Sequence, residues 1–185
     1  MIENKEFLGI KNGLPAAEHF LECQFVSCSL SNLNLSHKIF EDCIFNNCDL
    51  SNMKLGDTSF KHVSFQNCKM IGLQFSDCRT FLLEMHFKNC TLDYSSFSTL
   101  NLKQTTFQMC SLIESDFSST NLEKVHFKEC TLLRATFDRT NLKSADFRTA
   151  THYSIDPENN NIDKAKFSLP YVLGLLSKYA ITIET

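Results

Sequence analysis

Nine cysteines and six histidines are the residues of this 185-residue chain whose chemistry would matter most if they met at one place. Zinc sites usually show their ligands in close pairs, about two to four residues apart. The cysteines here are five or twenty residues apart, as in Cys23, Cys28 and Cys48, and the histidines are scattered. We therefore predict free structural thiols, surface histidines, and neither a metal nor a cofactor. The geometry also allows disulfides between cysteines twenty residues apart, but a reducing compartment argues against them.

Catalytic patterns are equally missing from the sequence. The chain has only five glycines and no glycine-rich phosphate loop. Adjacent carboxylates such as Glu41 and Asp42 fall at positions that we expect to lie outside, near lysines, which is typical of solvated charge. We therefore expect a protein that is not an enzyme.

The elements that position these residues follow from a five-residue repeat of large apolar side chains. An α-helix repeats about every 3.6 residues and a strand about every two, so neither alone explains this period. A period of five is typical of a solenoid, which is a stack of small, similar units. The repeat runs Phe20, Phe25, Leu30, Leu35 and so on to Phe75, and resumes after a slip of two residues as Leu82, Phe87, Leu92 and so on to Phe147.

A small residue stands two positions before most of the large ones. In extended backbone both side chains point the same way, so the large one fills the core and the small one, often cysteine, fits a corner. A second period shows how many sides close a coil, because Asn101, Asn121, Asn141 and Asn161 are twenty residues apart. The sequence thus predicts an all-β solenoid with four five-residue sides per coil and parallel pairing between coils.

The register slips once, between Phe75 and Leu82. With Leu82 taken as the next inward residue, Phe81 and Leu83 on either side of it should point outward, next to Arg79. An exposed aromatic residue at a bulge favours a partner contact. In the alternative interpretation, Phe81 folds back over its own coil. We name Arg79, Phe81 and Leu83 as candidate partner contacts.

Residues 120–124 (Thr-Asn-Leu-Glu-Lys) and 140–144 (Thr-Asn-Leu-Lys-Ser) resemble the repeats of the pentapeptide-repeat family, whose signature is A-(D/N)-L-x-x. The resemblance covers residues 19–150, with a further pair at Ile162 and Phe167. It implies a right-handed quadrilateral parallel β-helix. The chain departs from the family consensus by placing Cys where Ala is commoner, which should change the core volume and not the fold.

Both ends of the chain lose the regular repeat, and we expect them to cover the solenoid. Residues 1–18 should fold over the first coil as an N-terminal cap, ahead of the β-helix at 19–150. Residues 151–185 should complete the last coil and add a C-terminal cap, with His152 and Pro157 in the slots that large residues fill elsewhere. All of these parts form one domain.

The C-terminal segment also predicts an interface. A helix is expected with Ser168 as N-cap and Pro170 in its first turn, continuing to Lys178, followed by a short strand at 181–183. Its apolar residues exceed what one short amphipathic face needs. The alternative is a cap and nothing more. Members of the family dimerise end to end, so the resemblance implies a homodimer through Tyr171, Val172, Leu175, Leu176, Tyr179, Ile181 and Ile183.

Charge and hydropathy limit the partners. The formal net charge is −3, with 18 Lys and Arg against 21 Asp and Glu, which gives no strong field for nucleic acid. No apolar run approaches the roughly 18 residues that span a bilayer, and no signal peptide opens the chain, so we expect a soluble cytoplasmic protein. One side is mildly basic, with Lys88, Lys128 and Arg148. Another is mildly acidic and supplies further candidate contacts: Asp57, Asp77, Asp116 and Asp138.

Within the family, the chain resembles the quinolone-resistance branch. That resemblance implies a bacterial protein that binds DNA gyrase or topoisomerase IV and protects it from drugs, partly by imitating the shape and charge of duplex DNA. The insertion of two residues is short beside the projecting loops of known protective members. The second hypothesis is a general scaffold for protein–protein interaction with a different partner.

Overall fold

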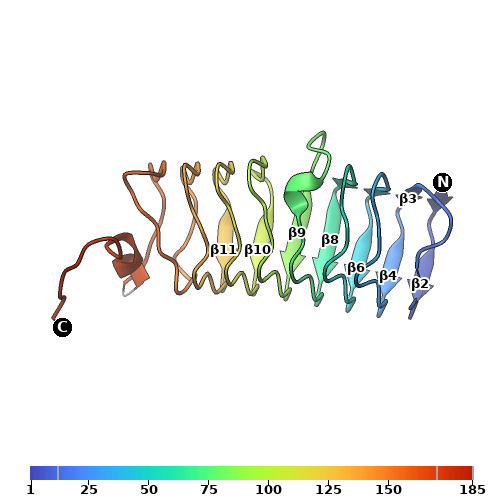
Figure 1. The fold of residues 1–185 in the computed structure, drawn as a ribbon, viewed down its shortest axis with the longest axis horizontal. Coiled ribbons are helices and arrows are strands. Elements are labelled where there is room, and N and C mark those ends of the chain that lie inside the picture. The colour runs from blue at the N-terminus through green and yellow to red at the C-terminus, as the bar shows by residue number, and fades with distance from the viewer. Residues whose placement is uncertain (12, 170, 185) are drawn as a thin grey trace.

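The computed structural model describes residues 1–11, 13–169 and 171–184. It is a long rod of stacked coils with the two termini at opposite ends (Figure 1). Every strand pair is parallel and in register, which confirms the predicted four-sided β-solenoid.

Two sides of the rod are hydrogen-bonded sheets. The four-stranded sheet has the order β1-β3-β5-β7, with β1 (Ile2–Glu3), β3 (His19–Leu21), β5 (Ile39–Glu41) and β7 (Ser59–Lys61). The seven-stranded sheet has the order β11-β10-β9-β8-β6-β4-β2, with β2 (Glu6–Leu8), β4 (Gln24–Val26), β6 (Ile44–Asn46), β8 (Val63–Gln66), β9 (Met85–Lys88), β10 (Thr106–Gln108) and β11 (His126–Lys128). On the other sides, isolated parallel bridges such as Ser111 to Thr131 join the coils.

Columns of phenylalanine form the core. Phe87, Phe107 and Phe127 stack with ring centroids 5.2 Å apart at each step. Phe97, from a different column, meets Phe107 edge-on at 5.7 Å. Stacked and edge-on geometries are both favourable for aromatic pairs, and burying each such side chain contributes about 1.5–3 kcal/mol. All nine cysteines are buried free thiols, as predicted.

The small position before each large residue does more than fill space. Cys43 donates its thiol hydrogen to the carbonyl of Phe20 in the preceding coil at 3.3 Å. Thr140 donates its hydroxyl to the carbonyl of Phe117 at 2.8 Å in the equivalent place. The position therefore suits a small side chain that can also donate, a property that cysteine, serine and threonine share and alanine lacks.

The corners between sides use left-handed backbone. Residues two positions after a large side chain have φ near +55°, as at Asn47 (56°), Asn52 (55°) and Asn67 (54°). Asparagine tolerates this region better than most residues. Each five-residue unit is therefore one short extended side followed by one left-handed corner.

The solenoid begins earlier than the strict repeat predicts. Ile2 in β1 pairs with Phe20, and Phe7 in β2 pairs with Phe25. Strands β1 and β2 thus add one rung to both sheets at this end of the rod. Ile2 lies eighteen residues before Phe20, and not twenty, so the twenty-residue period of the sequence does not reveal this first rung.

The last coil differs from the sequence expectation. Tyr153 and Ile155 are buried and fill the core, while His152 and Pro157 do not. His152 is an exposed corner residue with a φ of 60°. The assignment of His152 and Pro157 to core slots was wrong because the chain from 152 to 155 alternates outward and inward like a strand, so two nearby residues both face the core.

The C-terminal helix is shorter than predicted. It is a single 3-10 segment, η2 (Tyr171–Leu175), and it does not continue to Lys178. Ser168 donates its hydroxyl to a carbonyl of the preceding coil instead of capping the helix, and Pro170 lies outside the described residues. Residues 181–184 pair with no strand among the described residues, so the strand expected at 181–183 is not formed there. No helix in the described parts has the length and apolar character that a bilayer span requires.

Candidate protein-binding site

A loop at residues 79–84 interrupts the solenoid and projects from the rod beside β8 and β9 (Figure 1). The 3-10 segment η1 (Phe75–Asp77) and the buried Cys78 precede it. The backbone N–H of Glu84 donates to the carbonyl of Phe60 at 3.1 Å, which places Leu83 next to Phe60 in its column.

Leu83, and not Leu82, is the inward residue of this loop. Leu83 packs against the core, whereas Leu82 is 61% exposed. The expectation of an inward Leu82 and an outward Leu83 was therefore wrong by one residue. The cause is a shortened corner after the loop: Val63 follows Phe60 by three residues, but Met85, the partner of Val63, follows Leu83 by only two.

An ion pair anchors the first half of the loop to the preceding coil. Arg79 donates to Asp57 through Nε and Nη2, both at 2.6 Å, and its backbone N–H donates to the carbonyl of Thr58 at 2.8 Å. His37 Nδ1 lies 3.1 Å from the same carboxylate. Hydrogen bonds from Arg79 first, and then from His37, hold the pKa of Asp57 well below its usual range. Asp57 is thus a structural partner of the loop with a compensated charge.

Two histidines hold the other end of the loop. The Glu84 carboxylate lies 3.2 Å from His62 Nε2 and 3.2 Å from His86 Nε2. His62 Nδ1 also lies 3.4 Å from Asp42, so these contacts span three coils. Sequence reasoning missed this network, although residues 42 and 62 stand at the twenty-residue spacing that marks neighbouring coils. Across the described residues, no group of three or more His, Cys, Asp or Glu side chains is placed to hold a metal ion.

The tip of the loop is apolar and exposed. Phe81 is 74% exposed, as the first interpretation of the slip predicted, and it does not fold over its own coil. Leu82 stands beside it with a left-handed φ of 56°. Both ends of the loop are anchored, so its backbone is already ordered. A partner that binds Phe81 and Leu82 would therefore meet a small entropic cost of ordering the loop.

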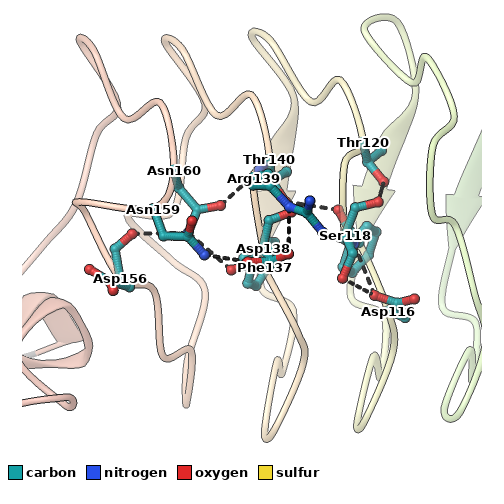
Figure 2. A network of polar contacts seen from close by, with 11 residues as sticks. Asp116, Ser118, Thr120, Phe137, Asp138, Arg139, Thr140, Asp156, Asn159 and Asn160 are labelled. Atoms are coloured by element: carbon teal, nitrogen blue, oxygen red, sulfur yellow. Dashed lines mark hydrogen bonds and ion pairs between the residues drawn. The ribbon is translucent and has the colours of Figure 1, made fainter.

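The four candidate aspartates fall into two groups. Asp77 is exposed at the corner beside Asp57, and its carbonyl accepts the backbone N–H of Asp57 at 2.8 Å. Asp116 and Asp138 lie on neighbouring coils farther along the rod, and each has its own hydrogen-bond partners (Figure 2). Asp57 and Asp138 each have an arginine partner, so this side of the rod is less acidic than its sequence predicts.

Figure 2 shows the second group and the buried amide next to it. Asp138 accepts from Arg139 Nε at 2.9 Å and from the side chain of Asn159. Asn160 donates to the carbonyl of Phe137 at 3.0 Å and accepts the backbone N–H of Thr140 at 2.9 Å. Asn160 takes the small position of its coil, so these contacts serve the fold.

The C-terminal segment leaves apolar side chains uncovered at the end of the rod. Five of the seven predicted dimer residues are exposed, while Val172 and Leu175 are half-buried against their own chain. Lys178 ties the segment to the last coil through Asp156 and Glu158, at 2.6 and 2.7 Å. Leu173, which the sequence already places in this apolar segment, and Leu169 are exposed here as well.

A family model described as the pentapeptide repeat region matches residues 18–85 and 81–167, which is most of the chain. The chain belongs to the pentapeptide-repeat family. Its periods of five and twenty, its inward pairs and its left-handed corners are therefore the family's repeat. No curated protein sequence matches the chain well enough to count as a relative.

Solved structures resemble this pentapeptide-repeat protein in fold. Two trypsin-treated variants of QnrB1, a plasmid-mediated fluoroquinolone resistance protein, align with TM-scores of 0.66 and 0.67 at 15% and 16% identity. The first alignment covers 99% of this chain and 97% of QnrB1, and the second covers 97% and 99%. HetL, a pentapeptide repeat protein involved in heterocyst differentiation regulation from the cyanobacterium Nostoc sp. strain PCC 7120, aligns at a TM-score of 0.50 and 11% identity over 88% of each chain. At these identities the likeness concerns the fold.

Proposed function

We propose that this pentapeptide-repeat protein is a non-enzymatic protein-binding module whose partner is a bacterial type II topoisomerase, DNA gyrase or topoisomerase IV, which it protects from quinolones. The observation that carries the proposal is the loop at 79–84, where two adjacent apolar side chains, Phe81 and Leu82, are exposed on backbone that is anchored at both ends. The resemblance of the repeats to the quinolone-resistance branch supports this choice of partner. Such a partner would place the protein in the cytoplasm.

A supercoiling assay tests the proposal. Gyrase inhibited by a fluoroquinolone should regain activity with micromolar wild-type protein. A Phe81→Ala/Leu82→Ala variant should need about ten-fold more protein, because apolar anchors carry much of the energy of an interface. Leu83→Ala is avoided, since it would leave a cavity against the core.

The matched control changes two exposed apolar residues away from the loop, Tyr94→Ala/Leu133→Ala. This variant should protect gyrase as the wild type does. An inert wild type would contradict the topoisomerase proposal, and a loop variant with full activity would contradict the loop as the contact.

A second candidate is a scaffold with a different protein partner. The pairing of Asp57 with Arg79 and of Asp138 with Arg139 favours it, because compensated aspartates imitate the charge of DNA poorly. Pull-downs that recover a protein other than a topoisomerase, and lose it with Phe81→Ala/Leu82→Ala, would support this candidate over the first.

We also propose that the protein forms a homodimer through its C-terminal segment, from Tyr171 to Ile183. The support is the exposed apolar cluster there. Leu176→Asp/Ile181→Asp should turn a dimer into a monomer in size-exclusion chromatography with light scattering, because buried unpaired charge opposes association. Leu133→Asp is the control and should leave the mass unchanged. A monomeric wild type at high micromolar concentration would overturn this proposal.

A further inference from the structure

The outer surface of the seven-stranded sheet carries a row of long side chains that end in N–H donors. Gln66, Lys88, Gln108 and Lys128 are in-register partners on β8, β9, β10 and β11, and Arg148 continues the row in the next coil. We call these five residues the donor row. Since neighbouring strands are about 4.8 Å apart, the row is about 19 Å long.

The positive charge of the donor row is largely uncompensated. Lys88 and Lys128 are exposed and form no ion pair with any other described residue. Lys166, one rung beyond Asp146, is a third exposed cation that forms no ion pair with another described residue. Glu129, at the corner after Lys128, is the exposed acidic group nearest in sequence to the row.

Arg148 is held in place by a buried carboxylate. Its Nη2 lies 2.7 Å from Asp146 Oδ2, and its Nε lies 3.0 Å from Oδ1. The side chain of Asp146 is only 10% exposed, and His126 Nδ1 is 3.8 Å from it. The pair keeps the pKa of Asp146 below its usual range and that of Arg148 above it. The guanidinium therefore has a fixed position, with Nη1 making no hydrogen bond within the described residues.

A groove of about 490 Å³ lies at this end of the row. Two cationic residues, Lys128 and Arg148, line it together with Gln108 and His126. The remaining lining residues belong to the same coils as Gln108 and Arg148: Thr106, Phe107, Asp146 and Thr149. The groove thus brings two cationic side chains and neutral donors together, and the one carboxylate in its lining, that of Asp146, is paired with Arg148.

We infer that the donor row is a docking surface for an extended acidic segment of a partner protein, with one carboxylate of that segment in the groove between Lys128 and Arg148. An extended peptide points every second side chain the same way, about 6.6 Å apart. Four acidic residues at alternate positions therefore span about 20 Å, which matches the length of the row. The charges are complementary, and Arg148 is already oriented for a carboxylate.

The same face is poorly suited to nucleic acid. Single strands bind on exposed aromatic side chains that stack with bases, and duplexes need a dense cationic field. The strands of this sheet expose no Tyr or Phe on the donor row, and the chain as a whole has a net charge of −3. The inference rests on the proposed protein-binding role, but it concerns a surface distinct from the loop at 79–84.

Fluorescence anisotropy with a labelled ten-residue peptide of alternating Glu and Ser tests the inference. The wild type should bind this peptide at low salt, with an affinity that falls as salt rises. Lys88→Gln/Lys128→Gln should weaken binding about ten-fold, which corresponds to the loss of two exposed charge pairs. Both lysines are exposed, so the variant should fold normally.

The charge-matched control is Lys54→Gln/Lys143→Gln, which removes two exposed lysines from other sides of the rod and should bind within about two-fold of wild type. Equal affinity of Lys88→Gln/Lys128→Gln and wild type would overturn the inference. So would tighter binding of a ten-nucleotide single strand at the same residues, or self-association of the protein that disappears in this variant.

The proposed gyrase contact at the loop and the proposed peptide contact at the donor row can be tested independently of each other. Lys88→Gln/Lys128→Gln should keep full protection of gyrase, while Phe81→Ala/Leu82→Ala should keep full binding of the acidic peptide. Loss of peptide binding in the loop variant would contradict the separation of the two surfaces.

Discussion

The small position two residues before each large side chain sets much of the chemistry of single residues in this rod. A cysteine there is sealed in the core and donates to the preceding coil, as Cys43 does to Phe20. Burial raises the pKa of Cys43 to about 11, and the neighbouring Cys110 thiol together with burial raises that of Cys90 to about 12. These thiols therefore remain protonated at neutral pH, which makes them poor nucleophiles and poor metal ligands.

A loss of stability at high pH follows from the raised thiol pKa values. In the unfolded chain Cys43 ionises near pH 9.0, whereas in the folded chain it stays neutral to about pH 11. The unfolded state therefore loses its proton first, and the free energy of unfolding should fall as the pH rises through this window. Urea unfolding at pH 7, 8, 9 and 10 measures the effect, which should be absent below pH 8.

Cys43→Ser is the matched control for this prediction. Serine keeps a donor for the Phe20 carbonyl and has no group that ionises in this range. Between pH 8 and pH 10, the free energy of unfolding of this variant should fall by about 1 kcal/mol less than that of the wild type. Identical losses in the two proteins would contradict a raised pKa at Cys43.

At the scale of elements, the repeat predicts the regular sides well and the irregular ones poorly. Columns such as Phe87, Phe107 and Phe127 could be predicted from spacing because each coil of the rod corresponds to the twenty-residue period of the sequence. The loop could be located but not resolved. The loop adds three residues to the coil and the corner after it loses one, so the sequence shows only the net insertion of two residues. From that net insertion Leu82 was predicted to face inward and Leu83 outward, which is the reverse of what the structure shows.

The groove beside the donor row was also out of reach of the sequence. Lys88, Lys128 and Arg148 could be assigned to one mildly basic side from their spacing. That Asp146 turns toward Arg148, and leaves Lys128 without a counter-charge, depends on rotamers that periodicity does not encode. The last coil was misassigned because Tyr153 and Ile155 both face the core there, which breaks the spacing of five between neighbouring inward residues.

Corner geometry gives a prediction at the same scale. Thr99 occupies a left-handed corner with a φ of 64°, which is strained for a β-branched residue, and its side chain is exposed. Thr99→Asn should stabilise the protein by about 1 kcal/mol, measured by chemical denaturation. Thr91→Asn, at a bridge position outside the corners, is the control and should bring no gain. A Thr99→Asn variant no more stable than wild type would contradict corner strain.

At the scale of the whole molecule, the rod separates its two candidate contacts. The loop at 79–84 interrupts the side that carries β1, β3, β5 and β7, while the donor row follows the seven-stranded sheet (Figure 1). Each coil is fixed by its neighbours on both sides, so the loop and the donor row are held on one stiff support. The exposed side chains of Phe81 and Leu82 therefore lie where the four-stranded sheet ends after β7, while the seven-stranded sheet continues past the loop from β8 to β9.

Backbone hydrogen exchange, measured by mass spectrometry with and without gyrase, tests that central claim most directly. The amides of residues 79–84 should exchange several-fold more slowly in the complex, and the loss of this protection in Phe81→Ala/Leu82→Ala should accompany loss of binding. Unchanged exchange at 79–84 in a complex that protects other parts of the rod would contradict the loop as the contact.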